Sequence, residues 1–164
     1  MDGANAVDSS RRFWRRGQTP LRPPWALAEA QFIERCSRCG DCQRACPQGI
    51  IISGDGGFAA IDFSRGSCTF CGLCVEACTP QALLRQPGQP PWPYRAQIGE
   101  ACLAVNGVMC RSCEDSCEPR ALRFRPQPGG ISRPQIDSAS CTGCGGCVAP
   151  CPVSAIHITV ANSV

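Results

Sequence analysis

Three groups of four cysteines share one spacing along this chain. In each group the pattern is C-x2-C-x2-C-x3-C, and a proline follows one or two residues after the last cysteine. Thiolates at such short intervals can all point into one tight loop, which suits the binding of a metal centre. The three groups are Cys36, Cys39, Cys42 and Cys46; Cys68, Cys71, Cys74 and Cys78; and Cys141, Cys144, Cys147 and Cys151.

This spacing is typical of a loop that binds a 4Fe–4S cluster. Three thiolates of one loop bind three irons, and the last cysteine of a second group binds the fourth. Zinc is a weaker alternative, because structural zinc sites separate their two CxxC pairs by a dozen or more residues. Disulfides are a third alternative, which belongs to an oxidising compartment. The repeated spacing therefore predicts iron–sulfur chemistry.

A further group of cysteines is irregular. Seven residues separate Cys102 from Cys110, and Cys113 and Cys117 follow at the usual intervals. Gly107 occupies the place where a regular group has its first cysteine. The longer loop adds about 0.9 kcal/mol of closure free energy, which is small beside the order of 10 kcal/mol that a structural metal site contributes. We therefore interpret Cys102 as a relocated ligand and not as the remnant of a decayed site.

Exchange of the last cysteine between neighbouring groups gives four predicted ligand sets with no cysteine left over. Set 1 is Cys36, Cys39, Cys42 and Cys78; set 2 is Cys46, Cys68, Cys71 and Cys74; set 3 is Cys102, Cys110, Cys113 and Cys151; set 4 is Cys117, Cys141, Cys144 and Cys147.

The loop of set 3 differs from the regular loops. Glu114 follows Cys113, and no glycine lies between Cys110 and Cys117. We therefore expect the cluster of set 3 to have a lower reduction potential or to be more labile.

The segments around these cysteines predict an α+β fold, with two pseudo-symmetric halves of β-hairpins and short helices built around clusters. Glycine-rich turns at residues 54–57 and 128–130 separate extended segments and predict one hairpin in each half. Residues 81–86 and 154–160 are expected as edge strands, and each last cysteine is expected to begin a short helix. The predicted divisions are a basic arm at 1–27, a first half at 28–86, a proline-rich linker at 87–96 and a second half at 97–164.

Composition supports a protein held together by its metal centres. Cysteine makes up 16 of the 164 residues, and aromatic residues only 6%, so each half would be marginal on hydrophobic burial alone. Four loaded clusters would change the formal net charge from +3 to about −5, at about −2 for each cluster with its thiolates. No apolar run follows the arginine-rich start, which favours a retained basic arm over a twin-arginine export signal. We expect a cytoplasmic protein without membrane insertion and without a nucleic-acid partner.

With these motifs laid out, the chain resembles the NapF family of ferredoxin-type proteins from periplasmic nitrate reductase systems. The resemblance rests on "SRRFWRRG", on "RPPW", on the order of the cysteine groups and above all on "EACLA" with "CRSCEDSCEP". It implies a tandem bacterial-ferredoxin-like protein with three to four 4Fe–4S clusters. It further implies a cytoplasmic accessory factor that assists iron–sulfur maturation of the catalytic subunit NapA before export.

The residues themselves leave a second function open. An electron-transfer ferredoxin, passing electrons to a reductase or a membrane oxidase, would use the same cysteines. A purely structural metal scaffold is a third alternative. No nucleophile constellation, phosphate-binding loop or carboxylate pair accompanies the cysteines, so we expect an electron carrier or accessory protein and not an enzyme.

Overall fold

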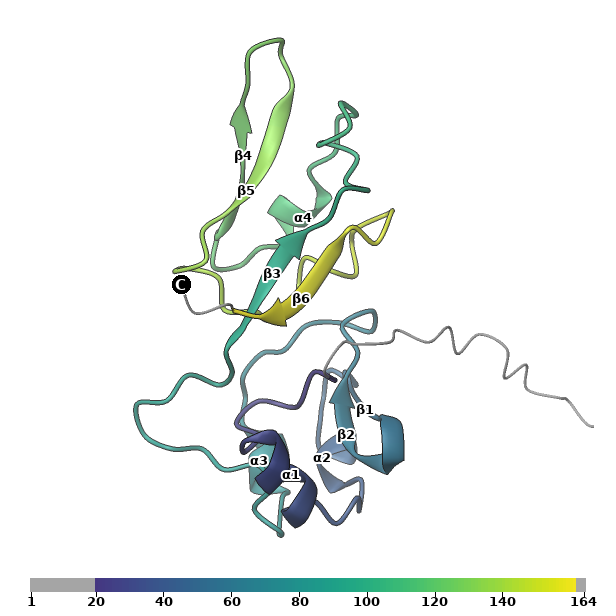
Figure 1. Cartoon of the computed structure of the whole chain (residues 1–164), viewed down its shortest axis with the longest axis vertical. Coiled ribbons are helices and arrows are strands. Elements are labelled where there is room, and N and C mark those ends of the chain that lie inside the picture. The colour runs from purple at the N-terminus through teal and green to yellow at the C-terminus, as the bar shows by residue number, and fades with distance from the viewer. Residues whose placement is uncertain (1–19, 162–164) are drawn as a thin grey trace, which may run out of the picture.

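The computed structural model describes residues 20–161. Its elements divide into a first half with three short helices and one hairpin, and a second half with four longer strands and one short helix (Figure 1). Residues 1–19, which hold most of the predicted basic arm, and residues 162–164 lie outside the described part.

The first half contains the predicted hairpin. Strand β1 (Ile51–Ser53) pairs antiparallel with β2 (Ala59–Ile61), and the short 3₁₀ helix η2 (Asp55–Gly57) connects them. Gly56 adopts φ 65° in this connection, a conformation that side chains other than glycine rarely take. Helices α1 (Glu29–Arg35), α2 (Asp41–Arg44) and α3 (Leu73–Glu76) complete this half.

The second half contains two antiparallel strand pairs. Strand β4 (Leu122–Pro126) pairs with β5 (Ser132–Ile136) across the predicted glycine turn, so this hairpin is confirmed. Strand β3 (Tyr94–Ile98) pairs with β6 (Ile156–Val160), and the single helix is α4 (Ser112–Asp115). The edge strand expected near the chain end is therefore β6, whereas the one expected at 81–86 is reduced to a single bridge between Leu83 and Ala26.

The predicted position of the short helices was wrong. Helices α2, α3 and α4 each contain the third cysteine of a group, which is Cys42, Cys74 or Cys113, and end before its last cysteine. The reason is that a left-handed glycine after the second cysteine, Gly40 or Gly72, starts the helix there. The fourth group has turns in place of a helix over residues 146–150.

The predicted arm and linker both extend too far into packed structure. Trp25 is buried, and Arg22 is 8% exposed while its guanidinium pairs with Glu29 at 2.6 Å. Residues 94–96 of the expected linker belong to strand β3, and Trp92 just before them is buried. Apolar rings and a satisfied ion pair favour burial of these residues, so they are parts of the core and not spacers.

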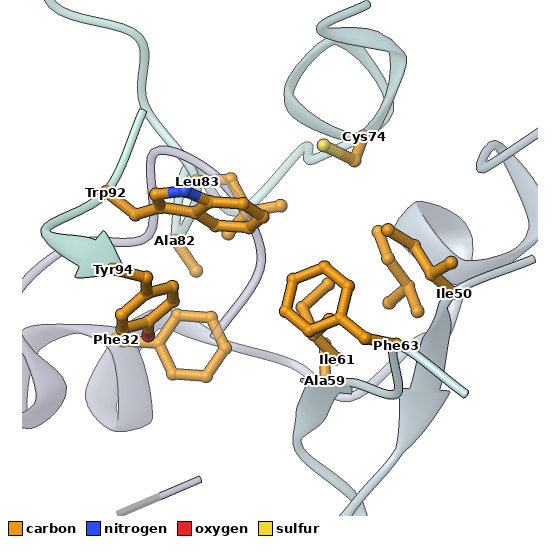
Figure 2. Close-up of a cluster of buried hydrophobic side chains, with 11 residues drawn as sticks. Phe32, Ile50, Ala59, Ile61, Phe63, Cys74, Ala82, Leu83, Trp92 and Tyr94 are labelled. Atoms are coloured by element: carbon orange, nitrogen blue, oxygen red, sulfur yellow. The ribbon is translucent and has the colours of Figure 1, made fainter. Parts of the chain in front are cut away.

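Two hydrophobic clusters form the core, one for each half. Phe32, Ile50 and Leu83 are almost fully buried in the first cluster, and Trp92, just before β3, and Tyr94, the first residue of β3, also belong to it (Figure 2). Leu122, Phe124 and Ile156 lie in the second cluster, which contains Cys113 and Cys147. Cysteines thus form part of both cores, as the composition indicated.

None of the helices within residues 20–161 has the length and apolar character needed to cross a membrane.

Candidate metal centres

All sixteen cysteines are free thiols in the structure. Most are partly buried, and Cys74, Cys113 and Cys147 are buried. The cysteines lie near one another in the combinations that exchange of the last cysteine predicts, although no three of them within residues 20–161 lie close enough to hold a single metal ion. Three of these sets line cavities, and the fourth is recognised from the thiols that surround Cys147.

Set 1 lines an open cavity of about 650 Å³ between the first two cysteine loops. Cys36, Cys39 and Cys42 come from one loop, and Cys78 comes from the end of the next group. Burial, followed by the nearby thiols Cys78, Cys36 and Cys39, raises the pKa of Cys42 to about 11. The last cysteine of the second group therefore lies with the first group.

Set 2 is the reciprocal arrangement. Cys46, Cys68, Cys71 and Cys74 line a cavity of about 350 Å³ together with Trp25, Ile50 and Ile51. Burial raises the pKa of Cys74 to about 12, and the thiols of Cys68, Cys42, Cys71 and Cys46 add to the shift. Cys42 of set 1 is thus also close enough to influence set 2.

Set 3 includes the displaced Cys102. This residue lines a cavity of about 350 Å³ together with Cys110, Cys113 and Cys151. The remaining walls are mainly apolar, with Ile98, Phe124 and Ile156 among them. Burial raises the pKa of Cys113 to about 11, and the thiols of Cys102, Cys110 and Cys151 contribute further. The longer loop therefore returns Cys102 to the other three.

Set 4 surrounds Cys147 with thiols from two groups. Burial raises the pKa of Cys147 to about 12, and Cys144, Cys141 and Cys117 are the thiols that add to it. Cys117 is the last cysteine of the irregular group. That group therefore contributes its final ligand in the same way as the regular ones.

The donor sets fit a 4Fe–4S cluster. One crowded thiol in each set resists ionisation, and Cys42, which is partly buried, and Cys74, Cys113 and Cys147, which are buried, all have raised pKa values. A positively charged iron–sulfur core would remove this obstacle, because it stabilises thiolates directly. Such a core, when bound, supplies one-electron redox chemistry. The assignment of each cysteine as a ligand remains a prediction.

One backbone N–H points at a thiol sulfur in each set among the described residues. Phe70 donates to Cys68, Leu83 to Cys78 and Leu122 to Cys117, each at 3.4 Å, and Ala155 donates to Cys151 at 3.2 Å. Such bonds favour the charged form of sulfur and help to set cluster potentials. Three of the four go to the last cysteine of a group.

The backbone of the regular groups repeats at two places in the loop. The residues before and after the second cysteine are left-handed, and the pairs are Arg38 and Gly40, Phe70 and Gly72, and Gly143 and Gly145. The residue three places after the last cysteine is left-handed in all four groups, and these residues are Gly49, Gln81, Arg120 and Ser154. The irregular group thus keeps the closing part of the motif and lacks the opening part.

Different residues shape the irregular loop. Arg111 follows Cys110 with φ −137°, where the regular groups have a left-handed glycine. The Asn106 side chain donates to the carbonyl oxygens of Glu100 and Cys102, at 2.7 and 2.9 Å, and so holds the inserted loop. Sequence reasoning missed Asn106, although an asparagine next to Gly107 is itself a turn signal.

Glu114 has a more specific position than the sequence suggested. Its carboxylate accepts hydrogen bonds from Arg111 Nε at 2.7 Å and from Phe124 N at 3.1 Å. Desolvation opposes ionisation, but these two bonds outweigh it and keep the pKa of Glu114 below its ordinary value. The charge expected to lower the potential of set 3 is therefore partly compensated by Arg111.

The two halves meet between set 2 and set 4. Cys68 N donates to the Cys144 carbonyl oxygen at 2.8 Å, and Trp92 Nε1 donates to the Thr142 carbonyl oxygen at 2.9 Å. A Cβ at Gly145 would overlap the ring of Phe63, so only glycine permits this close approach. Trp92 packs edge-on against Phe63 and Phe70, with ring centroids 5.9 and 5.3 Å apart. The junction brings cysteine loops of both halves together.

Comparison with known proteins agrees with this architecture. Two models of a 4Fe–4S dicluster domain match the chain, one over residues 35–83 and the other over residues 108–155. The chain is thus an iron–sulfur protein with two tandem ferredoxin-type domains. Cys102 lies outside both matched segments, which makes it the ligand candidate that rests most on the structure.

Curated relatives define the family more closely. The chain is 44% identical over 155 residues to the ferredoxin-type protein NapF of Escherichia coli, covering 92% of this chain and 94% of the relative. It is 43% identical over 136 residues to NapF of Haemophilus influenzae, covering 83% and 77%. The methylamine utilization ferredoxin-type protein MauM of Methylobacillus flagellatus is 34% identical over 162 residues, covering 87% and 68%. The chain belongs to the NapF family of ferredoxin-type proteins.

Proposed function

We propose that this protein is a cytoplasmic accessory factor that assists iron–sulfur maturation of the nitrate reductase catalytic subunit NapA before its export. The observation that carries the proposal is the similarity to NapF-type proteins along nearly the whole chain. The irregular cysteine group, which general ferredoxins do not share, lies within this similarity. The partner of the protein in this proposal is NapA in an immature form.

In this proposal the chain acts through its cysteine sets and turns over no substrate of its own. Sets 1, 2 and 4 hold 4Fe–4S clusters with regular loops, and set 3 holds a fourth through Cys102. The buried thiols and the N–H groups directed at sulfur support stable binding. The loop of set 3 is longer and is held by the Asn106 side chain. This loop supports a more labile cluster at set 3, suited to transfer of the cluster to a partner.

A second candidate function is electron transfer to a reductase or membrane oxidase. The contact between Cys68 and Cys144 favours it, because this contact places set 2 beside set 4 at the junction of the halves. Burial, together with the thiols of Cys46, Cys71 and Cys144, raises the pKa of Cys68 to about 11. At such a contact an electron could pass between a cluster at set 2 and a cluster at set 4 without an intermediate carrier.

The two functions differ in the form of the reductase that the protein binds. The cluster-loaded protein would be immobilised anaerobically and offered NapA retained in the cytoplasm before maturation, or mature NapA. The accessory function predicts capture of the immature form and transfer of iron to it. Capture of the mature enzyme alone, followed by its rapid reduction, would reject this function in favour of electron transfer.

A further inference from the structure

The solvent face of the β4–β5 hairpin is rich in arginine. Arg123, Arg125 and Arg133 are exposed, whereas Leu122 and Phe124 on the opposite face are buried. The register places Arg125 directly opposite Arg133, so two cations are neighbours across the strands. We call Arg123, Arg125 and Arg133 the arginine face.

Nothing in the described chain neutralises the central pair of this face. Within residues 20–161, neither Arg125 nor Arg133 forms an ion pair with a carboxylate or donates a side-chain hydrogen bond. Like charges directly opposite each other destabilise a strand pair, and a two-stranded sheet is marginal by itself. The arrangement costs the free protein stability that an anionic partner would restore, since each guanidinium presents a fork of N–H donors.

Apolar side chains adjoin the arginine face at the end of the hairpin. Ile131 is 44% exposed, and a Cβ at Gly107 would lie 3.7 Å from its Cδ1, so the hairpin end contacts the irregular loop. On that loop Val108 and Met109 are 52% and 96% exposed. Met109 directly precedes Cys110 of set 3. Arginine and exposed apolar side chains therefore adjoin the irregular cysteine site.

We propose that the arginine face, with Ile131, Val108 and Met109, is the surface that docks an acidic patch of immature NapA. This inference rests on the proposed accessory function and specifies the surface used. Arginine and methionine are enriched in the centres of protein interfaces. A nucleic acid fits less well, because it presents a row of phosphates that offers no match for the exposed apolar side chains.

Docking at this surface would bring the partner to set 3. Among the cysteines, Cys110 is adjacent in sequence to the most exposed apolar residue of the surface, Met109. The two regular sets at the junction lie against the other half, as the Cys68–Cys144 contact requires. The irregular loop would thus serve both as ligand carrier and as contact segment.

The test compares the binding of NapA by matched variants. The cluster-loaded protein, the double variant Arg125→Gln/Arg133→Gln and the control Arg35→Gln/Arg65→Gln would be titrated with immature NapA. Arg35 and Arg65 are exposed residues of the first half, so the control removes the same charge. Iron content, measured for each variant, reports that the cysteine sets are intact.

We expect the arginine-face variant to bind NapA roughly tenfold or more weakly at unchanged iron content, and the control to stay within about twofold. Raising the salt concentration should weaken the wild type and leave the double variant nearly unaffected. Equal binding by wild type and double variant would overturn the docking surface while leaving the accessory function standing. Equal losses in variant and control would overturn it too, because they indicate a general charge effect.

Failure of the wild type to bind immature NapA would overturn both the accessory function and this surface. A second variant, Met109→Ser, tests the apolar part without changing charge. We expect about a threefold or greater loss of affinity, since a fully exposed methionine contributes nothing to the free fold. Unchanged affinity would remove the irregular loop from the interface. Tighter binding of anionic vesicles than of NapA, abolished by the double variant, would reassign the surface to a membrane.

Discussion

The regular cysteine groups and the irregular group achieve similar clustering of thiols by different means. In the regular groups the residues on both sides of the second cysteine are left-handed, and one of them is always glycine. In the irregular group Arg111 takes the glycine's place in a different conformation, and Asn106 secures a longer loop. The closing turn after the last cysteine is the same in all four.

This difference separates two roles of one cysteine group. The opening part of a group forms the loop of its own set, and the last cysteine serves the neighbouring set. The irregular group changes the first role and keeps the second, since Cys117 still receives the N–H of Leu122 as Cys78 receives that of Leu83. A rebuilt loop thus need not disturb its neighbour.

The largest expected effect comes from a regular loop at the junction of the halves. Gly145→Ala would place a Cβ within the ring of Phe63, whereas Gly130→Ala has the same φ of 80° and no neighbour within 4 Å. Both lose about 1 kcal/mol to left-handed strain, and Gly145→Ala loses about 1–3 kcal/mol more from overpacking. Anaerobic urea titration, followed by the iron–sulfur absorbance, measures the difference. Equal midpoints for the two variants would contradict the close contact.

A smaller effect distinguishes the regular from the irregular loop directly. Gly72→Ala has room for its Cβ but keeps φ 86°, so it should cost about 1 kcal/mol of stability. Arg111→Ala loses a partly exposed ion pair with Glu114 and a cation–π contact with Phe124, and the ion pair is worth about 0.5 kcal/mol. The same titration would compare them. A greater loss for Arg111→Ala would mean that this arginine replaces the glycine structurally.

The smallest expected effect concerns the inserted loop. Asn106→Ala removes two hydrogen bonds on an exposed segment and should cost roughly 0.5 kcal/mol. It should hasten loss of iron from set 3 under a chelator while the other sets keep theirs. Gln135→Ala, on the exposed face of β5, is the control. Uniform loss of iron from all sets would show that the loop acts on the whole protein and not on set 3.

Sequence predicted the features that depend on spacing and on local turns. The hairpin at residues 51–61 follows from its glycine-rich turn, and the four thiol sets follow from exchange of the last cysteine. The helix positions were missed, because they depend on where a left-handed glycine interrupts the loop. Spacing reports which residues are near each other, but not which backbone conformation brings them there.

Long-range packing was also beyond the sequence. Trp92 lies in a proline-rich segment typical of a linker, yet its ring packs on Phe63 and Phe70 and its indole N–H bonds Thr142. The partner of β3 is β6, from the far end of the chain. Such pairings depend on tertiary burial, which overrides the local signal of proline.

The central claim is that Cys102 serves set 3 while Cys117 of the same group serves set 4. Anaerobic iron and sulfide content, with electron-resonance spectra, would be measured for the wild type and for the serine variants of Cys102, Cys151 and Cys117. We predict about 16 irons in the wild type and about 12 in each variant, at four irons per cluster. Cys102→Ser and Cys151→Ser should lose the same spectral component, and Cys117→Ser a different one. Full iron content in Cys102→Ser, or loss of the same component in Cys102→Ser and Cys117→Ser, would contradict the account.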